Sequence, residues 1–257
     1  MVEMSPSAAR EFWKALMDNA SALVADAHTL LAAGSYGRAR SLSVLAQEEL
    51  GKARWIYEEF SFSWNEGDET PRAVDKLAQH GRSHTAKYLE AVVFGDELAE
   101  FRGDYSRIRE LVSNLDTWEK TYARRQEEAE LAAREANRAK QRGFYVDRAD
   151  DGSVQSPTAV PAGTTDADLQ TAAQVIEMLL IRDHTRMKHD ATTPYDSTHE
   201  QQFRLLPVAH PEDWAAFLDA GSRGKPDPAE TTARSAEPAG EKPEIPSDQE
   251  NDQAAES

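Results

Sequence analysis

Apolar residues recur at every third or fourth position through most of the first 190 residues, the spacing that places them on one face of an α-helix. In the segment 36–60, at about 100° per residue, they form a single stripe. This stripe consists of Leu42, Leu45, Ala46, Ala53, Ile56 and Phe60. Glu49 lies at its centre, whereas Glu48 points away. Because an unpaired buried carboxylate is costly, we expect Glu49 to meet a polar partner on another helix.

The same periodicity predicts four further helices. Pro6 suits the first turn of the first of them, and Gly34 marks its end. The long fourth helix continues into a segment rich in alanine and charged residues, which has a high helix propensity and a thin apolar stripe. The predicted ranges are 5–33, 72–94, 101–142 and 167–188. Together with 36–60 they predict an all-α fold, a bundle of four to five helices.

The bundle is interrupted by one irregular loop excursion and followed by irregular chain. Residues 144–146 form a short β-like run, after which turn residues dominate as far as 166. Residues 221–257 are rich in Pro, Glu, Ala and Ser and cannot bury enough apolar surface to offset the entropy of ordering. We therefore expect a helical domain over residues 1–190, an irregular extension over 191–220 with a short helix after Pro211, and a disordered acidic tail over 221–257.

Composition and charge exclude several classes of protein. The chain has no cysteine, so it holds neither a disulfide framework nor a thiolate metal site. Its formal net charge of −17 argues against loose, charge-driven binding to nucleic acid. No apolar run approaches the roughly 20 residues that span a bilayer, and the N-terminus lacks the basic and apolar regions of a signal peptide. We expect a cytoplasmic protein with no membrane association.

Motifs for common cofactors are also missing. The sequence contains no Walker A motif, no G-x-G-x-x-G after a strand and no G-x-S-x-G nucleophile elbow. The Glu-x-x-His pattern that two helices of a di-iron bundle would carry does not occur either. We expect neither a cofactor nor a metal.

Polar residues lie at the edge of the apolar face on three of the predicted helices. Glu49 and its neighbour Lys52 lie on the second helix, and the other two helices carry one pair each. The predicted polar core comprises Glu49, Lys52, His84, Lys87, Asn19 and Asp26. Two interpretations are open. The residues form a polar network that fixes the register of the helices, or they line a cleft with a perturbed carboxylate and a histidine.

The segment "KQRGFYVD" brings basic and aromatic residues together at the end of the fourth predicted helix. It contains Lys140, Arg142, Tyr145 and Asp147 around a glycine. One interpretation is a glycine stop signal after which the aromatic pair folds back on the bundle. The other is a corner that binds an anionic partner or a base.

Two of these segments, in this order, resemble a known family. "AGSYGRARSLSVLAQEELGKA" (33–53) is similar to the second-helix signature of AbiV-type abortive infection proteins. "KQRGFYVDRADDGSVQSP" resembles the segment that follows their long helix. "NASALVADAHTLL" and "HTAKYLEAV" also look like the family's first-helix and third-helix patterns. The resemblance covers about residues 8–190.

The resemblance implies a HEPN-like domain, an antiparallel helical bundle that is often a homodimer. It also implies a role in defence against phage, in which a phage-encoded trigger protein activates the effector. The effector then arrests the growth or translation of the host by acting on RNA or the translation machinery. Two alternatives of other classes stay open: a non-catalytic helical scaffold and a sensor of a small ligand.

Many HEPN proteins are metal-independent ribonucleases whose motif is an arginine, four to six intervening residues and then a histidine. The histidine shuttles the 2′-hydroxyl proton and the arginine stabilises the charge of the phosphorane. Arg182 and His189 fit this spacing at the end of a predicted helix, and we expect them to be the catalytic pair. Arg204 and His210 fit the bare spacing too, in a segment that contains a proline. The alternative is that the cationic residues around Arg182 complement the helix dipole.

Overall fold

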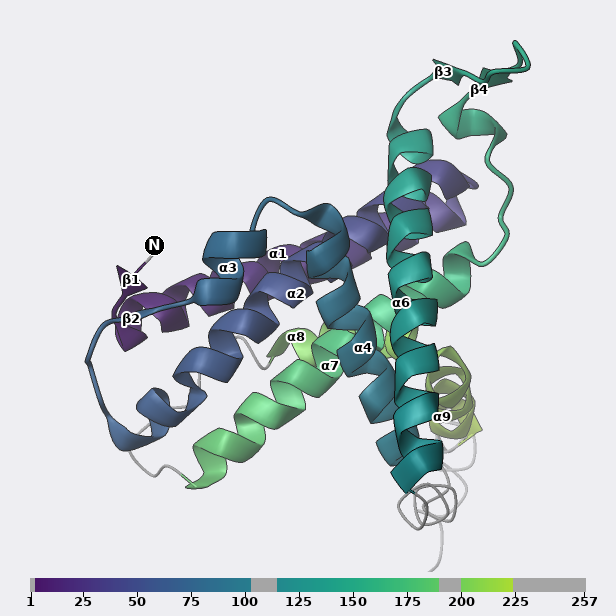
Figure 1. The fold of residues 1–257 in the computed structure, drawn as a ribbon. Helices are drawn as coiled ribbons and strands as arrows, with labels where there is room; N and C mark the ends of the chain where they lie inside the picture. Colours follow the sequence, from purple (N-terminus) through teal and green to yellow (C-terminus); the bar gives the residue numbers. More distant parts are fainter. Residues whose placement is uncertain (1–2, 103–114, 190–199, 224–257) are drawn as a thin grey trace, which may run out of the picture. The chain divides into compact units, whose positions relative to one another are not determined.

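The computed structural model describes residues 3–102, 115–189 and 200–223, which are helical apart from two short two-stranded sheets. This confirms the predicted all-α fold (Figure 1). The chain divides into two units, Met1–Trp214 and Ala215–Ser257, and the described part of the second is the remainder of helix α9. The elements are β1 Glu3–Met4, α1 Pro6–Ala32, α2 Tyr36–Glu66, β2 Arg72–Ala73, α3 Asp75–His80, α4 His84–Arg102, α6 Leu115–Phe144, β3 Asp147–Arg148, β4 Val154–Gln155, the 3-10 helix η1 Pro157–Ala159, α7 Thr165–His189, α8 Gln201–Ala209 and α9 Pro211–Arg223.

Helices α1 and α2 form a long antiparallel hairpin. The side chain of Ser5 caps α1 by accepting a hydrogen bond from the backbone N–H of Ala8 at 3.2 Å, and Pro6 follows in the first turn. Gly34, with φ of +72°, makes the tight connection that few other residues adopt without strain. Helix α2 runs six residues beyond the predicted end at Phe60, to Glu66, and Gly67 caps it.

The hydrophobic core lies where α1, α2 and α7 meet. Each of these helices contributes large apolar side chains that are almost fully buried, and each such side chain stabilises the fold by about 1.5–3 kcal/mol. The largest are Trp13, Met17, Leu50, Ile56, Phe60, Leu169, Ile176, Leu179 and Leu180. On the other side of α2, α6 crosses it steeply and α4 lies beside α6 (Figure 1).

The predicted third helix, 72–94, is wrong as a single element. The structure divides it into β2, α3 and α4, and β2 pairs antiparallel with β1 at the start of the chain. The break occurs at "HGRSH", where Gly81 ends α3. Ser83 then caps the first turn of α4 by accepting a hydrogen bond from Ala86 at 3.3 Å. Local turn and cap residues therefore override an apolar periodicity that continues across them.

The predicted helix 101–142 is described only in part. Its first two residues belong to α4, residues 103–114 lie outside the described part, and α6 occupies the rest as far as Phe144. The β-like run predicted at 144–146 is displaced. The strand β3 begins at Asp147 and pairs antiparallel with β4 around a turn at Gly152, φ +83°.

The last part of the chain contains more helix than the sequence predicts. Helix α7 matches the predicted 167–188 closely, and α9 is the short helix expected after Pro211. Helix α8 was not predicted, because Pro207 inside it breaks the pattern of a helix interior. The predicted disordered tail falls on 221–223, which end α9, and on 224–257, which lie outside the described residues. The predicted domain boundaries at 190 and 220 stay predictions.

Glycine and serine bring the backbones of α2 and α6 into direct contact. A Cβ atom at Gly143 would overlap the hydroxyl of Ser41 and the carbonyl of Gly37. The Ser41 hydroxyl also lies 2.9 Å from the carbonyl oxygen of Lys140. At this crossing no side chain larger than hydrogen fits on α6, so the distance between the two helices is set by their backbones.

The substitution Gly143→Ala tests this contact. It should lower the free energy of unfolding by about 1–3 kcal/mol, because the added methyl group overpacks the crossing. In an open helix the same change would raise that free energy by up to about 1 kcal/mol. Urea unfolding followed by circular dichroism gives the sign, and a stabilised variant would show that the two backbones are not in contact.

Candidate functional site

One carboxylate is buried between three helices. Glu48 of α2 is 2% exposed, and three basic side chains from two other helices surround it. Its Oε1 pairs with Nζ of Lys140 from α6. Its Oε2 lies 3.3 Å from Nζ of Lys87 and 2.7 Å from Nδ1 of His84, both from α4. These four residues are called the Glu48 centre below.

The local sequence of α2 makes this meeting possible. Gly51 lies three residues after Glu48, and a Cβ atom there would overlap the backbone carbonyl of Lys87. On the α6 side, the contact of Ser41 with the carbonyl of Lys140 brings that lysine up to α2. Small residues on both sides of Glu48 therefore allow α4 and α6 to come close enough for their lysines to reach one carboxylate.

The charges of the Glu48 centre are largely withdrawn from water. The side chains of Lys87 and Lys140 are 9% and 5% exposed, so both ammonium groups depend on Glu48 for compensation. The side chain of His84 differs, because half of it is exposed. The contact of Nδ1 with the carboxylate fixes the orientation of the imidazole ring. The centre thus combines buried ion pairs with one histidine at its exposed edge.

The predicted position of the buried carboxylate was wrong by one residue. Glu49 forms a local ion pair with Lys52 at 2.7 Å, and their side chains are 20% and 19% exposed. The error arose because α2 is covered on two sides, and the second side is lined by small and polar residues that a hydrophobic stripe does not register. The signal available in the sequence is a second stripe at helical spacing: Gly37, Ser41, Val44, Glu48 and Gly51.

Of the other predicted members of the polar core, two belong to the Glu48 centre and two do not. His84 and Lys87 contact a glutamate of α2, as expected, but this glutamate is Glu48 and not the predicted Glu49. Asn19 and Asp26 are exposed on α1 and lie outside the Glu48 centre. Their seven-residue spacing does place them on one side of the helix, but that side faces solvent.

The segment around Arg182 belongs to a second buried centre. Asp183 is fully buried and accepts two hydrogen bonds from Arg10 of α1, at 2.9 and 2.8 Å. Arg186 donates to the same carboxylate at 3.0 Å and to Asn65 of α2 at 3.3 Å. This Asp183 centre ties the end of α7 to the start of α1 and the end of α2, so the polar residue after Arg182 has a structural partner.

Arg182 itself is exposed and lies over an aromatic ring. Its guanidinium carbon is 5.2 Å from the ring centroid of Tyr57. Nine residues of α2 separate Tyr57 from Glu48, about 13 Å along the helix, so Arg182 and His84 do not share one centre. The side chain of His189 lies outside the described side chains. The catalytic pairing of Arg182 with His189 therefore stays a prediction.

Arg204 and His210, which also fit the ribonuclease spacing, are used differently. The Nε2 atom of His210 lies 2.6 Å from a carboxylate oxygen of Glu177 on α7, and Arg204 is exposed on α8. The side chains of Gln170 and Gln174 donate to the carbonyl of Ala209, at 3.2 and 3.0 Å. These contacts hold the end of α8 against α7.

The basic and aromatic corner predicted at the end of α6 is not a single cluster. Lys140 points inward to Glu48, whereas Arg142 is exposed. Tyr145 is 63% exposed, and Asp147, also exposed, accepts a hydrogen bond from the backbone of Arg148 at 2.8 Å. One helical turn thus directs one cation into the bundle and leaves the other at its surface.

Two general features of the described residues complete the picture. None of the helices in the described part is long and apolar enough to cross a membrane. No three His, Asp or Glu side chains among these residues come together in a way that would hold a metal ion.

Comparison with known families identifies the part of the chain that contains the Glu48 centre. The family model HEPN_AbiV, described as AbiV, matches residues 8–177, more than half of the chain. The chain belongs to the AbiV family. No curated protein and no solved structure matches it. The AbiV match includes all four residues of the Glu48 centre and ends before Arg182, so it gives no support of its own to a catalytic role for Arg182 and His189.

The Glu48 centre predicts a sharp contrast between two adjacent glutamates. Glu48→Gln should lower the free energy of unfolding by about 3–5 kcal/mol, because two buried ammonium groups lose their carboxylate. Glu49→Gln is the matched control, since it removes only a local, partly exposed pair and should cost less than about 1 kcal/mol. Urea unfolding of both variants checks this, and equal losses would contradict the assignment of the buried role to Glu48.

The Asp183 centre predicts a distinct loss of stability at high pH. Burial, with a contribution from Asp183, raises the pKa of Tyr57 to about 12, against the opposing charges of three arginines. In the unfolded chain this phenol ionises near its ordinary value of about 10. As pH rises from about 10 to 12, the unfolded state therefore releases a proton that the folded state keeps, and this costs up to about 1.4 kcal/mol per pH unit.

Tyr57→Phe removes that ionisation. The variant should lose less stability than the wild type between pH 9 and pH 11, measured by urea unfolding at each pH. Tyr145→Phe serves as the control, because it removes a phenol that is 63% exposed at the surface. Identical pH profiles for the wild type and Tyr57→Phe would show that Tyr57 does not titrate with folding.

Proposed function

We propose that this chain is an abortive-infection effector of the cytoplasm. A phage-encoded protein triggers it, and it then arrests the growth of the infected host by acting on RNA or on the translation machinery. The observation that carries the proposal is the AbiV family match over residues 8–177. The expected working form is a homodimer.

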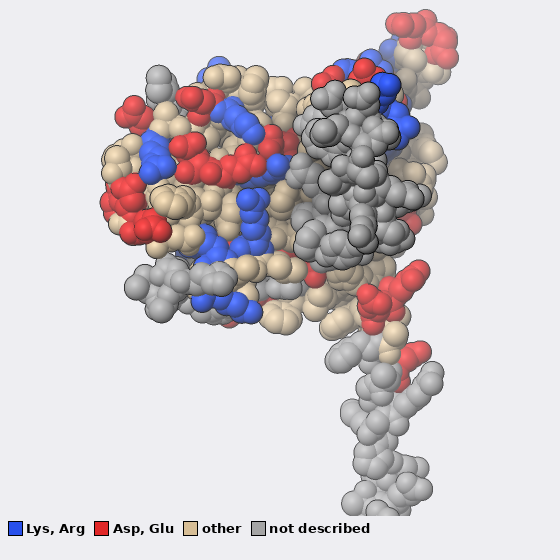
Figure 2. Space-filling view, turned by 60° about the horizontal axis from the view of Figure 1, so that its bottom comes forward, with Lys and Arg blue, Asp and Glu red and all other residues tan. Residues whose placement is uncertain are grey.

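The charge of the molecule favours a local contact with RNA over a broad electrostatic one. The formal net charge is −17, and on the face shown in Figure 2 acidic and basic side chains are interspersed. Non-specific binding to a phosphate backbone draws its strength from many cations that replace counterions. An effector of this composition would instead engage RNA or a ribosomal partner through a small site.

Two modes of arrest follow from this proposal. In the enzymatic mode, His189 moves the 2′-hydroxyl proton and Arg182 stabilises the phosphorane, without a metal. In the binding mode, the effector blocks translation without cutting RNA. The contacts of Asp183 and Arg186 with α1 and α2 favour the binding mode, because they commit the residues around Arg182 to holding the bundle together.

The test compares infected cells that express the wild type, Arg182→Ala or His189→Ala. Arg134→Ala and His28→Ala are the matched controls, since each removes an exposed residue of the same type from another helix. Incorporation of labelled amino acids reports translation, and purified protein with host RNA in EDTA reports metal-independent cleavage. Circular dichroism confirms that each variant is folded.

The outcomes separate the two modes. Cleavage that disappears in both test variants and persists in both controls supports the enzymatic mode. Arrest of translation with intact RNA supports the binding mode. If infection leaves both RNA and protein synthesis unchanged in cells that contain the wild type, the proposed function fails.

A further inference from the structure

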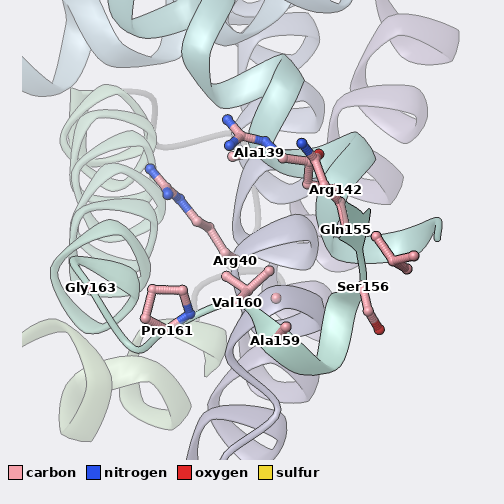
Figure 3. Close-up of a pocket in the computed structure, with 11 residues that line it drawn as sticks. Arg40, Ala139, Arg142, Gln155, Ser156, Ala159, Val160, Pro161 and Gly163 are labelled. Atoms are coloured by element: carbon pink, nitrogen blue, oxygen red, sulfur yellow. The ribbon is translucent and has the colours of Figure 1, made fainter. Parts of the chain in front are cut away.

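A pocket of about 450 Å³ lies beside the α2–α6 crossing, and Glu48 is not among its lining residues (Figure 3). Three parts of the chain enclose it: the first turns of α2, the last turns of α6 and the segment 154–163. Its volume falls in the range of pockets that bind small molecules. The lining residues are Gly37, Arg40, Ala139, Arg142, Val154, Gln155, Ser156, Ala159, Val160, Pro161 and Gly163.

The pocket is positively charged in a strongly acidic chain. Arg40 of α2 and Arg142 of α6 both line it, and no Asp or Glu belongs to the lining (Figure 3). Among the described residues no carboxylate pairs with Arg142, although acidic residues of the whole chain outnumber basic ones by 46 to 29. Two guanidinium groups from separate helices thus line one pocket, and a guanidinium group binds phosphate through charge-assisted hydrogen bonds.

The walls of the pocket are fixed by close packing. A Cβ atom at Gly37 would lie 2.6 Å from the carbonyl oxygen of Pro157 and 3.1 Å from a methyl group of Val160, so this loop rests directly on the backbone of α2. Ser156 places its hydroxyl 3.4 Å from the backbone N–H of Thr158, which stabilises the 3-10 turn η1. Val160 and Pro161 add an apolar side to the cationic one.

Arg40 already has a partner that a ligand would replace. Its Nε lies 3.0 Å from a carboxylate oxygen of Asp168 in the first turn of α7. Burial raises the pKa of Asp168 above its ordinary value even though the charge of Arg40 acts in the opposite direction. A phosphate dianion between Arg40 and Arg142 would gain two charge-assisted contacts, whereas Asp168 satisfies only one of these arginines.

We propose that this pocket binds a small phosphorylated ligand, with the phosphate between Arg40 and Arg142 and the rest of the ligand against Val160 and Pro161. The sequence alone suggested an anionic partner for Lys140, Arg142, Tyr145 and Asp147. The structure retains only Arg142 of that group and adds Arg40. This site lies apart from the Glu48 centre, and the proposal holds whether or not the chain arrests translation.

Isothermal titration calorimetry with the full chain tests the proposal. The probes are inorganic phosphate, a nucleoside 5′-monophosphate, the same nucleoside without phosphate, and a short RNA with a 5′-phosphate. The monophosphate should bind more tightly than inorganic phosphate, and the nucleoside should not bind. Binding of the RNA alone would contradict a small-ligand pocket and assign the phosphate site to an RNA end.

Three variants locate the binding. Arg142→Gln should weaken binding of the monophosphate by about tenfold or more, because it removes one of the two guanidinium groups that line the pocket. Arg138→Gln is the matched control, an exposed arginine one turn earlier on α6 that does not line the pocket, and it should bind as the wild type does. Asp168→Asn should tighten binding severalfold, because it releases Arg40.

The contrary results are equally specific. If Arg138→Gln weakens binding as much as Arg142→Gln, the effect is one of overall charge and the pocket assignment fails. No measurable binding of the monophosphate or of inorganic phosphate at millimolar concentration would overturn the proposal as well.

Discussion

The architecture depends on one constraint: three helix backbones must approach closely enough for two lysines to share the carboxylate of Glu48. A buried ion pair returns its desolvation cost only when its geometry is good and each charge is compensated. Gly51 provides the approach of α4, and Gly143 with Ser41 provides that of α6. These glycines are thus required by the same geometry that buries the glutamate, so the close helix contacts and the ion pair are one structural unit.

Most of the helical fold follows from the sequence, because its main determinant is an apolar stripe against the core. The pattern identifies α1, α2 and α7 and the apolar stripe of α6, all of which bury apolar side chains. It fails where other interactions decide. The capped break at Gly81 divides one predicted helix, and tertiary packing stabilises α8 in spite of Pro207. Caps and tertiary contacts act through single residues, and an apolar pattern that is read over many residues does not detect them.

The Glu48 centre was less accessible to prediction than the fold, for a related reason. The sequence indicated that a glutamate of "AQEELGKA" meets His84 and Lys87, which is right for α2 and α4. It missed α6 with Lys140 and wrongly included α1. The choice of Glu49 over Glu48 assumed that α2 has one buried face. A helix covered on both sides buries small and polar residues as well. Which positions are buried on the second side depends on how closely the backbones of the neighbouring helices approach, and not on hydrophobicity. That information lies in the spacing of Gly37, Ser41 and Gly51.

Charge compensation separates the structural cations of this chain from those available to a ligand. Lys87 and Lys140 are compensated by Glu48, and Arg10 and Arg186 by Asp183, and all four are largely buried. Such groups cannot be given to a substrate without leaving a buried charge behind. His84 and Arg142 are different, because each is exposed and each lies next to a rigid crossing of α2. In a molecule with an excess of carboxylates, an accessible basic group is where an anion can bind. The helices α4 and α6 that pack on α2 therefore carry both kinds of cation: lysines buried against Glu48, which fix the fold, and exposed groups at the margins of the same contacts.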